Sequence, residues 1–592
     1  MSKETVVGKA FDLKILRRIF AFTKPYKKKF YLSVGLTLVL AFVAILRPVL
    51  IQHTVDNYII HLDAAGLSYM MLLMVGLLIT QTVLQYIHTY LTNWLGQSVV
   101  KDLRVKLFRH ILSLRLKFFD HTPIGTLVTR TVSDLETIAD IFSEGLIVII
   151  GDLLMLLLIV LAMFYIDWRL ALISLSTIPI LMIATRIFQY GINKTFREVR
   201  NQVAALNTFV QEHITGISVV QIFNREEEEM NRFKKINKEH MKANIRSVWY
   251  YSIFFPVVEL LSTTSLGLLI WWGSSGVISH DVSLGNIMAF IMYINLLFRP
   301  IRELADKFNT LQMGMVSGER VMKVLDTSEF IEDKGKLKRN IDGNIRFENV
   351  WFAYNDSLDP DETEWILKDV SFEIKSGETL ALIGATGAGK SSVINLVSRM
   401  YEFQKGRITI DNIDIREYEL SELRKQIAVV LQDVFLFSDS IINNITLNDH
   451  SIKSDQVVAA SKAVGADSFI ERLPGKYDFN VMERGAMLSV GQRQLISFIR
   501  AYVFDPAILI LDEATSSIDS ESEELIQNAT TTLTKNRTSI VIAHRLATIQ
   551  NADKIIVLDH GRVMEEGNHQ ELLKKEGLYK ELYDIQFSSR SQ

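Results

Sequence analysis

Six long apolar stretches constrain the fold of this 592-residue chain more than any other feature of its sequence. Each has about twenty residues or more, the length that a helix needs to cross a bilayer. They lie approximately at residues 30–52, 67–95, 142–165, 169–190, 250–272 and 284–303. One such stretch fits a buried helix of a soluble protein, but six cannot share a soluble core of this size. The first half is therefore predicted to be an all-α domain of six transmembrane helices.

The loops between these stretches predict the orientation of the domain. Segments 96–141 and 191–247 are rich in Lys and Arg, whereas segments 53–66 and 273–283 contain neither. Basic loops stay on the cytoplasmic side of a membrane, so both long loops and both termini are predicted to be cytoplasmic.

The two basic loops have helix-like sequences, which predict long cytoplasmic extensions of the membrane helices. Each loop also contains a break where the chain can turn, one at Phe118–Gly125 and the other at Glu212–Ile217. Such turns are suited to pressing on a second domain. A solvated loop is an equally good interpretation of the same pattern.

Polar residues within the apolar stretches are candidates for function, because ionisable groups are costly in hydrocarbon. The candidates are Arg47, Asp152, Glu259, Gln85 and His88. One interpretation is a polar pathway for a solute. The other is a structural pair between Arg47 and an acid that holds two helices together.

A charged, polar run at 327–343 separates a membrane domain at 1–326 from a second domain at 344–592. The net charge of -3 gives no indication of a nucleic-acid partner. The chain has no cysteine, which excludes disulfides and thiolate metal sites.

A glycine-rich stretch in the second domain matches the P-loop pattern. It consists of Gly384, Ala385, Thr386, Gly387, Ala388, Gly389, Lys390 and Ser391, followed by Ser392. A buried strand is predicted before it at 379–383, and a helix is predicted after it at 392–400. In that context backbone N–H groups, a helix N-terminus and Lys390 surround phosphate oxygens, and Ser391 is placed to hold Mg²⁺. A chance glycine-rich turn is the weaker interpretation, so triphosphate binding is predicted.

Two further apolar runs end in side chains suited to the same chemistry. Residues 507–511 are predicted to form a central parallel strand, which ends in Asp512 and Glu513. Asp512 can hold Mg²⁺ through water, and Glu513 can accept a proton from attacking water. Residues 427–431 repeat the pattern with Gln432 at the tip, where its amide oxygen can meet Mg²⁺ or water.

Two aromatic side chains have a functional and a structural interpretation. His544 follows the predicted strand 539–543 and can reach a γ-phosphate or orient Glu513, although a lone histidine is more often structural. Tyr354 closes the strand-like run 344–354 and offers a face for adenine, although a lone tyrosine usually serves packing.

The stretch Leu488–Gln494, which opens a helical run, makes a family resemblance specific. Together with the P-loop, Gln432, the Asp512–Glu513 strand end, Ser516–Asp519 and His544, it resembles the ordered motif set of ABC-transporter ATPase domains. With the six membrane stretches, residues 13–585 resemble a half-size ABC exporter, a membrane domain fused to an α/β P-loop ATPase domain.

The resemblance implies that two ATPase domains close head to tail around two ATP molecules. Each site would pair Gly384–Ser392 of one chain with Ser489, Gly491 and Gln492 of the other. Tyr354 would stack on adenine, and Ser391, Gln432 and Asp512 would serve Mg²⁺. Glu513 would be the general base, His544 the γ-phosphate switch and Asp519 a link between the two sites.

Val490 departs from the family pattern, which usually has glycine at this position of the signature. Valine keeps the backbone N–H but restricts φ and adds bulk, which weakens the expected contact with the other chain. A heterodimer with a related half-transporter is therefore an alternative. The other motifs are intact, so a homodimer is preferred.

The predicted activity is ATP-driven export of a hydrophobic or amphipathic cargo, a drug or a lipid, by alternating access. The alternatives are a peptide exporter, a soluble ABC ATPase, an ABC importer and an ATP-gated channel. The fusion of both domains argues against an importer, and six spanning stretches argue against a soluble ATPase. The layout suggests a prokaryotic plasma (inner) membrane, with lipid as a further partner.

Overall fold

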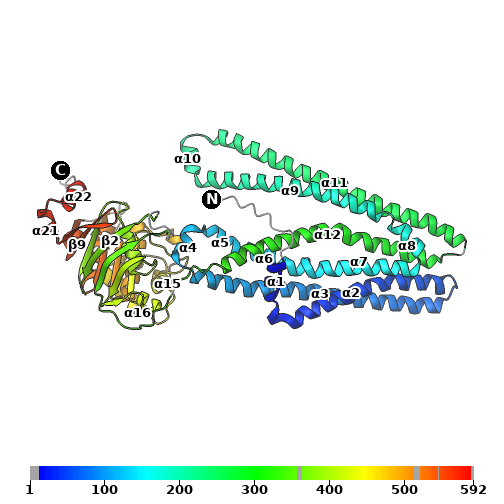
Figure 1. The fold of residues 1–592 in the computed structure, drawn as a ribbon, viewed down its shortest axis with the longest axis horizontal. Helices are drawn as coiled ribbons and strands as arrows, with labels where there is room; N and C mark the ends of the chain where they lie inside the picture. The colour runs from blue at the N-terminus through cyan, green and yellow to red at the C-terminus, as the bar shows by residue number, and fades with distance from the viewer. Residues whose placement is uncertain are drawn as a thin grey trace. The chain divides into compact units, whose positions relative to one another are not determined.

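The computed structural model describes residues 13–279, 281–331, 333–355, 363–512, 520–543 and 546–587. The chain forms two compact units (Figure 1). The first comprises residues up to 112 together with 124–327, and the second comprises 113–123 together with 328–592. The segment 113–123 thus belongs to the second unit, although it lies within the membrane half of the sequence.

The first unit is built from helices. They are α1 (Leu13–Ala21), α2 (Lys27–Thr54), α3 (Ala64–Ser113), α5 (Ile124–Thr131), α6 (Ser133–Asp140), α7 (Leu146–Ile166), α8 (Trp168–Leu175), α9 (Ile178–Thr215), α10 (Ile217–Ile222), α11 (Glu226–Ile278) and α12 (Leu284–Leu325). Among the described residues, six helical segments are long and apolar enough to cross a membrane: 24–59, 64–113, 124–166, 168–215, 226–278 and 284–325. Each predicted apolar stretch lies within one of them, which confirms the all-α, six-helix membrane domain.

The helices continue well beyond the apolar stretches, as the sequence predicted. Helix α11 begins with four glutamates at 226–229, more than twenty residues before its apolar part. Acidic side chains are favourable there because the N-terminus of a helix carries partial positive charge. The predicted break near Glu212–Ile217 is also present, since α9 ends at Thr215 and the short helix α10 follows.

Helices α9 and α11 pack along each other, while α12 packs against α2, α6 and α7. Gly191 of α9 permits a close approach, because a Cβ there would lie 2.2 Å from the ring of Tyr250 in α11. Small residues at such crossings are typical of membrane helices, which associate through tight packing. Phe188 of α9 and Phe254 of α11 stack nearby, with ring centroids 4.1 Å apart.

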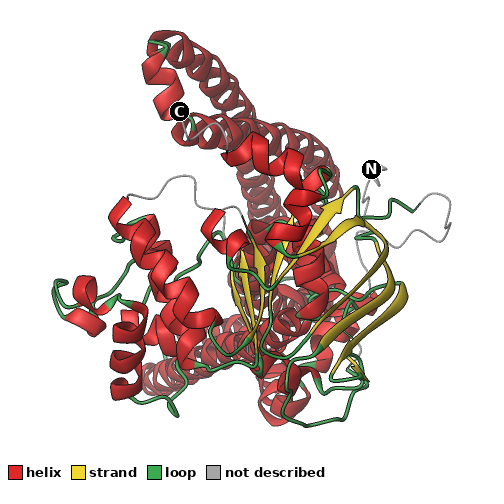
Figure 2. Ribbon diagram, turned by 90° about the vertical axis from the view of Figure 1, so that its left-hand side faces the viewer, coloured by secondary structure: helices red, strands yellow, loops and turns green. Residues whose placement is uncertain are grey.

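The second unit contains two β-sheets (Figure 2). The strands are β1 (Ile345–Phe352), β2 (Leu367–Ile374), β3 (Thr379–Ile383), β4 (Lys405–Ile410), β5 (Ile413–Asp414), β6 (Ile427–Val430), β7 (Ile508–Asp512), β8 (Thr538–Ile542), β9 (Lys554–Asp559) and β10 (Arg562–Gly567). The smaller sheet is antiparallel, in the order β2-β1-β4-β5. The larger has the order β10-β9-β3-β8-β7-β6, and all its strands except β10 run parallel.

Helices accompany these sheets. They are α4 (Leu116–His121), α13 (Lys390–Val397), α14 (Leu420–Lys425), α15 (Ile441–Thr446), α16 (Ser454–Val464), α17 (Asp467–Ile470), α18 (Val490–Val503), α19 (Ser520–Thr534), α20 (Leu546–Gln550), α21 (His569–Lys574) and α22 (Leu578–Phe587). The predicted α/β fold of this half is confirmed. Strand β7 lies between β8 and β6, and Ile508 to Leu511 are buried, as expected for a central parallel strand.

Replacing Gly191 by alanine is expected to destabilise the contact between α9 and α11, since the new Cβ overlaps the Tyr250 ring. Overpacking of this kind costs about 1–3 kcal/mol, so the Tm of the detergent-solubilised protein should fall. Gly267→Ala in α11 is the matched control, because no neighbouring atom lies within 4 Å of its Cβ position. Equal Tm values for the two variants would contradict this account.

Candidate functional site

The P-loop joins β3 to α13, the strand–loop–helix arrangement that the sequence predicted. Gly384, Gly387 and Gly389 all have positive φ angles, of 156°, 85° and 105°. At Gly384 a Cβ would lie 2.2 Å from the carbonyl oxygen of Leu558. Side chains rarely adopt such angles and none fits at Gly384, so this loop depends on glycine. It curls the backbone immediately before the N-terminus of α13, where N–H groups lack partners within the helix.

Lys390 is the first residue of α13, and its side chain folds back over the loop. Its Nζ donates to the carbonyl oxygens of Gly384, at 2.8 Å, and Ala385, at 3.0 Å. Burial lowers the pKa of Lys390, and the carboxylate of Asp512 opposes this effect. A cation held above a loop of glycines is chemically suited to the oxygens of a polyphosphate.

Parallel pairing brings three predicted site residues to the same edge of the larger sheet. Asp512 is the last residue of β7 and pairs in register with Ile542 of β8. Gln432 is exposed and lies two residues beyond the end of β6. Ser391 is exposed in the first turn of α13, directly after the P-loop. Carboxylate, amide and hydroxyl oxygens are ligands that Mg²⁺ accepts.

Three other predicted residues lie outside the described part of the chain: Glu513, Asp519 and His544. Glu513 directly follows Asp512, and His544 comes two residues after β8. The strand ends that precede Glu513 and His544 are neighbours, because β7 and β8 pair in parallel.

Tyr354 is half-buried and packs against the helix that follows the P-loop. Its hydroxyl lies 3.1 Å from Ser392 Oγ and accepts a hydrogen bond from Asn395 Nδ2 at 3.3 Å. Its ring meets those of Phe352 and Tyr401 edge-on, with centroids 4.8 and 5.0 Å away. Tyr354 is therefore anchored to α13, and Ser392, a predicted phosphate-loop residue, is buried beneath it.

The signature stretch forms the N-terminus of α18. Ser489 is the N-cap and forms a capping box with Gln492. Ser489 Oγ accepts from the Gln492 N–H at 3.2 Å, and Gln492 Oε1 accepts from the Ser489 N–H at 3.0 Å. Such a box satisfies two donors at the start of a helix and fixes both side chains at its tip. Gly491 is buried just inside the helix.

Val490 occupies the first position of α18 with its side chain half-exposed. The helix starts there without a break in its backbone, so the predicted restriction of φ causes no distortion in this chain. Of the two predicted effects of valine, only the added bulk remains.

The signature and the P-loop belong to different parts of the second unit. Helix α18 packs with α15, α16 and α19, and its buried residues share a hydrophobic cluster with Leu509 and Leu511 of β7. The buried residues of α13 belong to a separate cluster with the smaller sheet. Each motif is thus supported by its own core.

Comparisons with known proteins agree with both halves of this architecture. Residues 30–301 match the family model for the ABC transporter transmembrane region, and residues 367–516 match the model for ABC transporters. The chain is 38% identical over 592 residues to YknV of Bacillus subtilis, named as an uncharacterized ABC transporter ATP-binding protein, with 99% of this chain and 97% of the relative covered. It is 35% identical to an ATP-dependent lipid A-core flippase of Desulfotalea psychrophila, with 97% of this chain and 99% of the relative covered. It is 36% identical, with the same coverage, to Bacillus subtilis YgaD, whose name assigns it to multidrug export.

The chain belongs to the ABC transporter family. Its membrane region and its ATPase region lie in one polypeptide, as in half-size exporters. The transporter is therefore an integral membrane protein that couples ATP hydrolysis to transport.

The second unit of the transporter also contains the segment 113–123, including helix α4. The hydroxyl of Tyr401, which follows α13, donates to the carboxylate of Asp120 in this helix. Burial, together with the Asp120 carboxylate, raises the pKa of Tyr401, so its hydroxyl remains a proton donor. The backbone N–H of Arg115 donates to the Glu329 carbonyl at 2.9 Å. Asp120, which lies in the first of the two predicted turns, thus contacts the ATPase half through the hydrogen bond from Tyr401.

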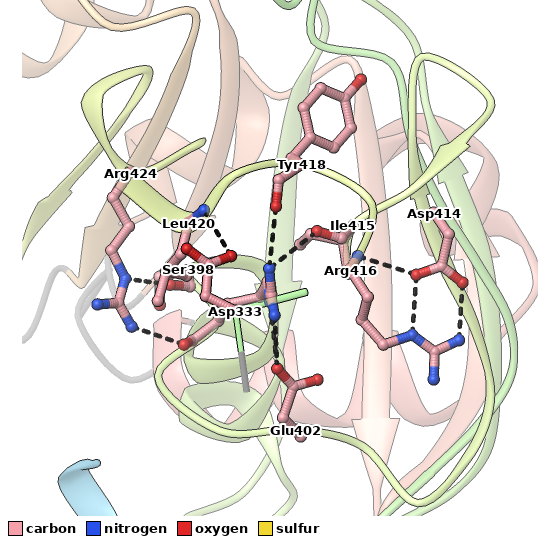
Figure 3. Close-up of polar contacts among 10 residues, drawn as sticks. Asp333, Ser398, Glu402, Asp414, Ile415, Arg416, Tyr418, Leu420 and Arg424 are labelled. Carbon is pink, nitrogen blue, oxygen red and sulfur yellow. Dashed lines mark hydrogen bonds and ion pairs between the residues drawn. The ribbon is translucent and has the colours of Figure 1, made fainter. Parts of the chain in front are cut away.

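Two arginines hold the loop that carries Tyr401. Figure 3 shows one of them, Arg424, beside Ser398 of this loop. Arg399 is only 1% exposed and donates to Glu402 Oε1 at 3.0 Å and to two backbone carbonyls near 3.4 Å. Arg424 donates to the carbonyl oxygens of Arg399, at 2.7 Å, and Ser398, at 3.3 Å. A buried guanidinium is tolerated only when its donors are satisfied, and here it fixes the loop between α13 and β4.

Sequence reasoning identified the turn but missed Tyr401, Arg399 and Arg424. The run from Ser398 to Glu402 follows the P-loop helix directly and contains Arg399, Tyr401 and Glu402. These charged and aromatic side chains next to a predicted site could have indicated a contact surface. The edge-on contact of Tyr401 with Tyr354 connects the segment 113–123 to the first turn of α13.

Replacing Tyr401 by phenylalanine should loosen α4 while keeping the ring packing. A hydrogen bond to a charged group contributes about 1.5–3 kcal/mol, so local opening of 116–121 should become roughly tenfold more frequent or more. Hydrogen–deuterium exchange read by mass spectrometry measures this directly, with α16 as an internal control. Unchanged exchange in α4 would show that the bond does not hold it.

Proposed function

We propose that two copies of this chain form an exporter whose ATPase domains close head to tail around two ATP molecules. Closure and hydrolysis move a hydrophobic or amphipathic cargo, a drug or a lipid, across the membrane by alternating access. Relatives named as a lipid A-core flippase and for multidrug export support this class of cargo.

The observation that carries the proposal is the division of the nucleotide site within one chain. The P-loop and the capped N-terminus of α18 both offer N–H donors, but each rests on its own hydrophobic core. A head-to-tail pair of chains brings the P-loop of one against Ser489, Gly491 and Gln492 of the other. Both anion-binding helix ends then serve one triphosphate.

Each predicted residue takes one role in this site. Tyr354 stacks on adenine, and residues 384–392 surround the phosphates. Ser391, Gln432 and Asp512 hold Mg²⁺, an assignment that fits their oxygen donors at one sheet edge. When bound, Mg²⁺ neutralises phosphate charge that develops during the reaction.

Hydrolysis proceeds by in-line attack of water on the γ-phosphate. Glu513 accepts a proton from this water, His544 contacts the γ-phosphate, and Asp519 connects the two sites across the dimer. Lys390 leaves its contacts with the loop carbonyls and pairs with phosphate oxygens. Positioning and charge neutralisation supply most of the rate gain.

Closure reaches the membrane helices through the turns at Phe118–Gly125 and Glu212–Ile217. The bond between Tyr401 and Asp120 and the anchoring of Tyr354 on α13 support a path from the nucleotide to the first turn. The transporter lies in a prokaryotic plasma membrane with its ATPase domain and both termini in the cytoplasm, an orientation supported by the basic loops.

Glu513→Gln is expected to retain ATP binding while turnover falls by roughly 10²–10⁴-fold, because the general base is lost. Binding of a fluorescent ATP analogue and phosphate release, measured on the same preparation, separate the two effects. Glu581→Gln, an exposed residue of α22, is the control. Near-normal hydrolysis by Glu513→Gln would refute the assignment.

Purified alone, the chain should have the mass of a dimer and hydrolyse ATP. Mass photometry of the detergent-solubilised protein and its ATPase rate decide this together. An inactive monomer that becomes active only with a second, related half-transporter would replace the homodimer by the heterodimer that Val490 suggests.

A further inference from the structure

The second predicted turn lies at the tip of a hairpin, where the short helix α10 joins α9 to α11 (Figure 1). This tip is far along the chain from the apolar stretches 169–190 and 250–272, so it belongs to the extensions outside the membrane. No side chain of α10 is buried. The conformation of the turn therefore depends on residues that bridge α9 and α11 across it.

His213, in the last turn of α9, forms such a bridge. Its Nε2 lies 2.8 Å from Oε2 of Glu229, which is in the first turn of α11. Its Nδ1 lies 2.7 Å from the carbonyl oxygen of Phe209, and the ring stacks on that of Phe209 with centroids 3.8 Å apart. The side chains of His213 and Glu229 are only 25% and 18% exposed, so solvent screens this His213–Glu229 bridge incompletely.

Both ring nitrogens of His213 face atoms that can only accept hydrogen bonds. A carbonyl oxygen and a carboxylate have no proton to donate, so both nitrogens must donate for both bonds to exist. Neutral imidazole carries one N–H, whereas the imidazolium ion carries two. The geometry therefore fits the protonated ring, and loss of its proton removes one of the two bonds.

The charged groups around the ring favour the same protonation state. Arg232 of α11 donates to Glu229 at 2.9 and 3.3 Å, and the bonds from His213 and Arg232 lower the pKa of Glu229. Glu212 of α9 adds a further negative charge near the ring, and α10 contains no titratable residue. Within this bridge, His213 is thus the group that titrates near neutral pH.

The sign of the pH dependence follows from these partners. The Glu229 carboxylate, followed by the Phe209 carbonyl, raises the pKa of His213 above its ordinary value of 6.5. A group whose pKa is raised in the bridged state stabilises that state fully below its ordinary pKa. The stabilisation is lost as the pH rises through the raised pKa.

We propose that the His213–Glu229 bridge is a pH switch for the second turn, closed in mildly acidic conditions and open above neutral pH. The closed bridge ties the end of α9 to the start of α11 and fixes α10 between them. The inference rests on the proposed function in one respect, since a fixed turn passes closure of the ATPase domains to the membrane helices more completely than a loose one. Acidification of the cytoplasm therefore strengthens coupling.

Hydrogen–deuterium exchange of residues 212–229 tests the bridge itself. Comparing each variant with the wild type at the same pH cancels the intrinsic exchange rate. At pH 6.0 the segment should exchange roughly threefold faster in His213→Gln than in the wild type, the size expected for a partly exposed ion pair. At pH 8.5 the two should be equal. His213→Lys, a cation at both pH values, should protect the segment by the same factor relative to His213→Gln at each pH.

His240→Gln is the matched control. His240 is also on α11, but its Nε2 lies 2.9 Å from Asn244 Nδ2, a contact within one helix. Its exchange over 212–229 should equal that of the wild type at both pH values. Equal exchange of the wild type and His213→Gln at pH 6.0, or a difference that persists unchanged at pH 8.5, would overturn the switch.

Spin labels test the consequence for coupling. Ala65→Cys, an exposed position in the predicted outer loop, accepts one label per copy in this cysteine-free chain. Mg²⁺-ATP should change the distance between the two labels. The fraction of molecules that change should be larger at pH 6.0 than at pH 8.5 in the wild type, and equal at the two pH values in His213→Lys.

The possible failures are distinguishable. If the exchange differences appear but Mg²⁺-ATP changes no distance at either pH, the proposed function is refuted and the switch stands. If the distance changes equally at both pH values in the wild type, export stands and the role of the bridge in coupling is refuted.

Discussion

The parallel pairing of β3 with β8, and of β8 with β7, is the constraint on which the ATPase half depends. Parallel strands deliver their carboxyl ends to one edge, so the P-loop after β3 and Asp512 at the end of β7 lie at the same edge of the sheet. The buried strands supply rigidity, and the glycine-dependent loop supplies N–H donors at the same edge. The arrangement of the predicted nucleotide site is thus a consequence of sheet topology, with Lys390 as the cation beside the loop.

The membrane half meets a different constraint, since hydrocarbon offers no partner for polar groups. Backbone groups are satisfied within long helices, and those helices approach closely at glycines such as Gly191 and Gly151. The charged side chains are satisfied by one another in the cluster of Asp152, Glu303 and Lys307.

Much of this organisation follows from sequence because periodicity and motif spacing are local. The six spans, the P-loop and the strand ends at Gln432 and Asp512 needed no tertiary information. The partner of Asp152 was not predictable, since Lys307 is 155 residues away and lies beyond the end of its apolar stretch. The bond between Tyr401 and Asp120 was not predictable either, because it joins residues 281 positions apart. The roles of Glu513 and His544 stay predictions, because both lie outside the described residues.

The central claim is that two copies close around nucleotide, and a distance between copies tests it most directly. The chain has no cysteine, so Lys535→Cys, at an exposed position after α19, accepts one spin label per copy without further changes. Pulsed electron–electron double resonance should show a shorter distance between the two labels when Mg²⁺-ATP is added, and no shortening in the same protein with Lys390→Ala. An identical distance distribution with and without Mg²⁺-ATP would contradict the account.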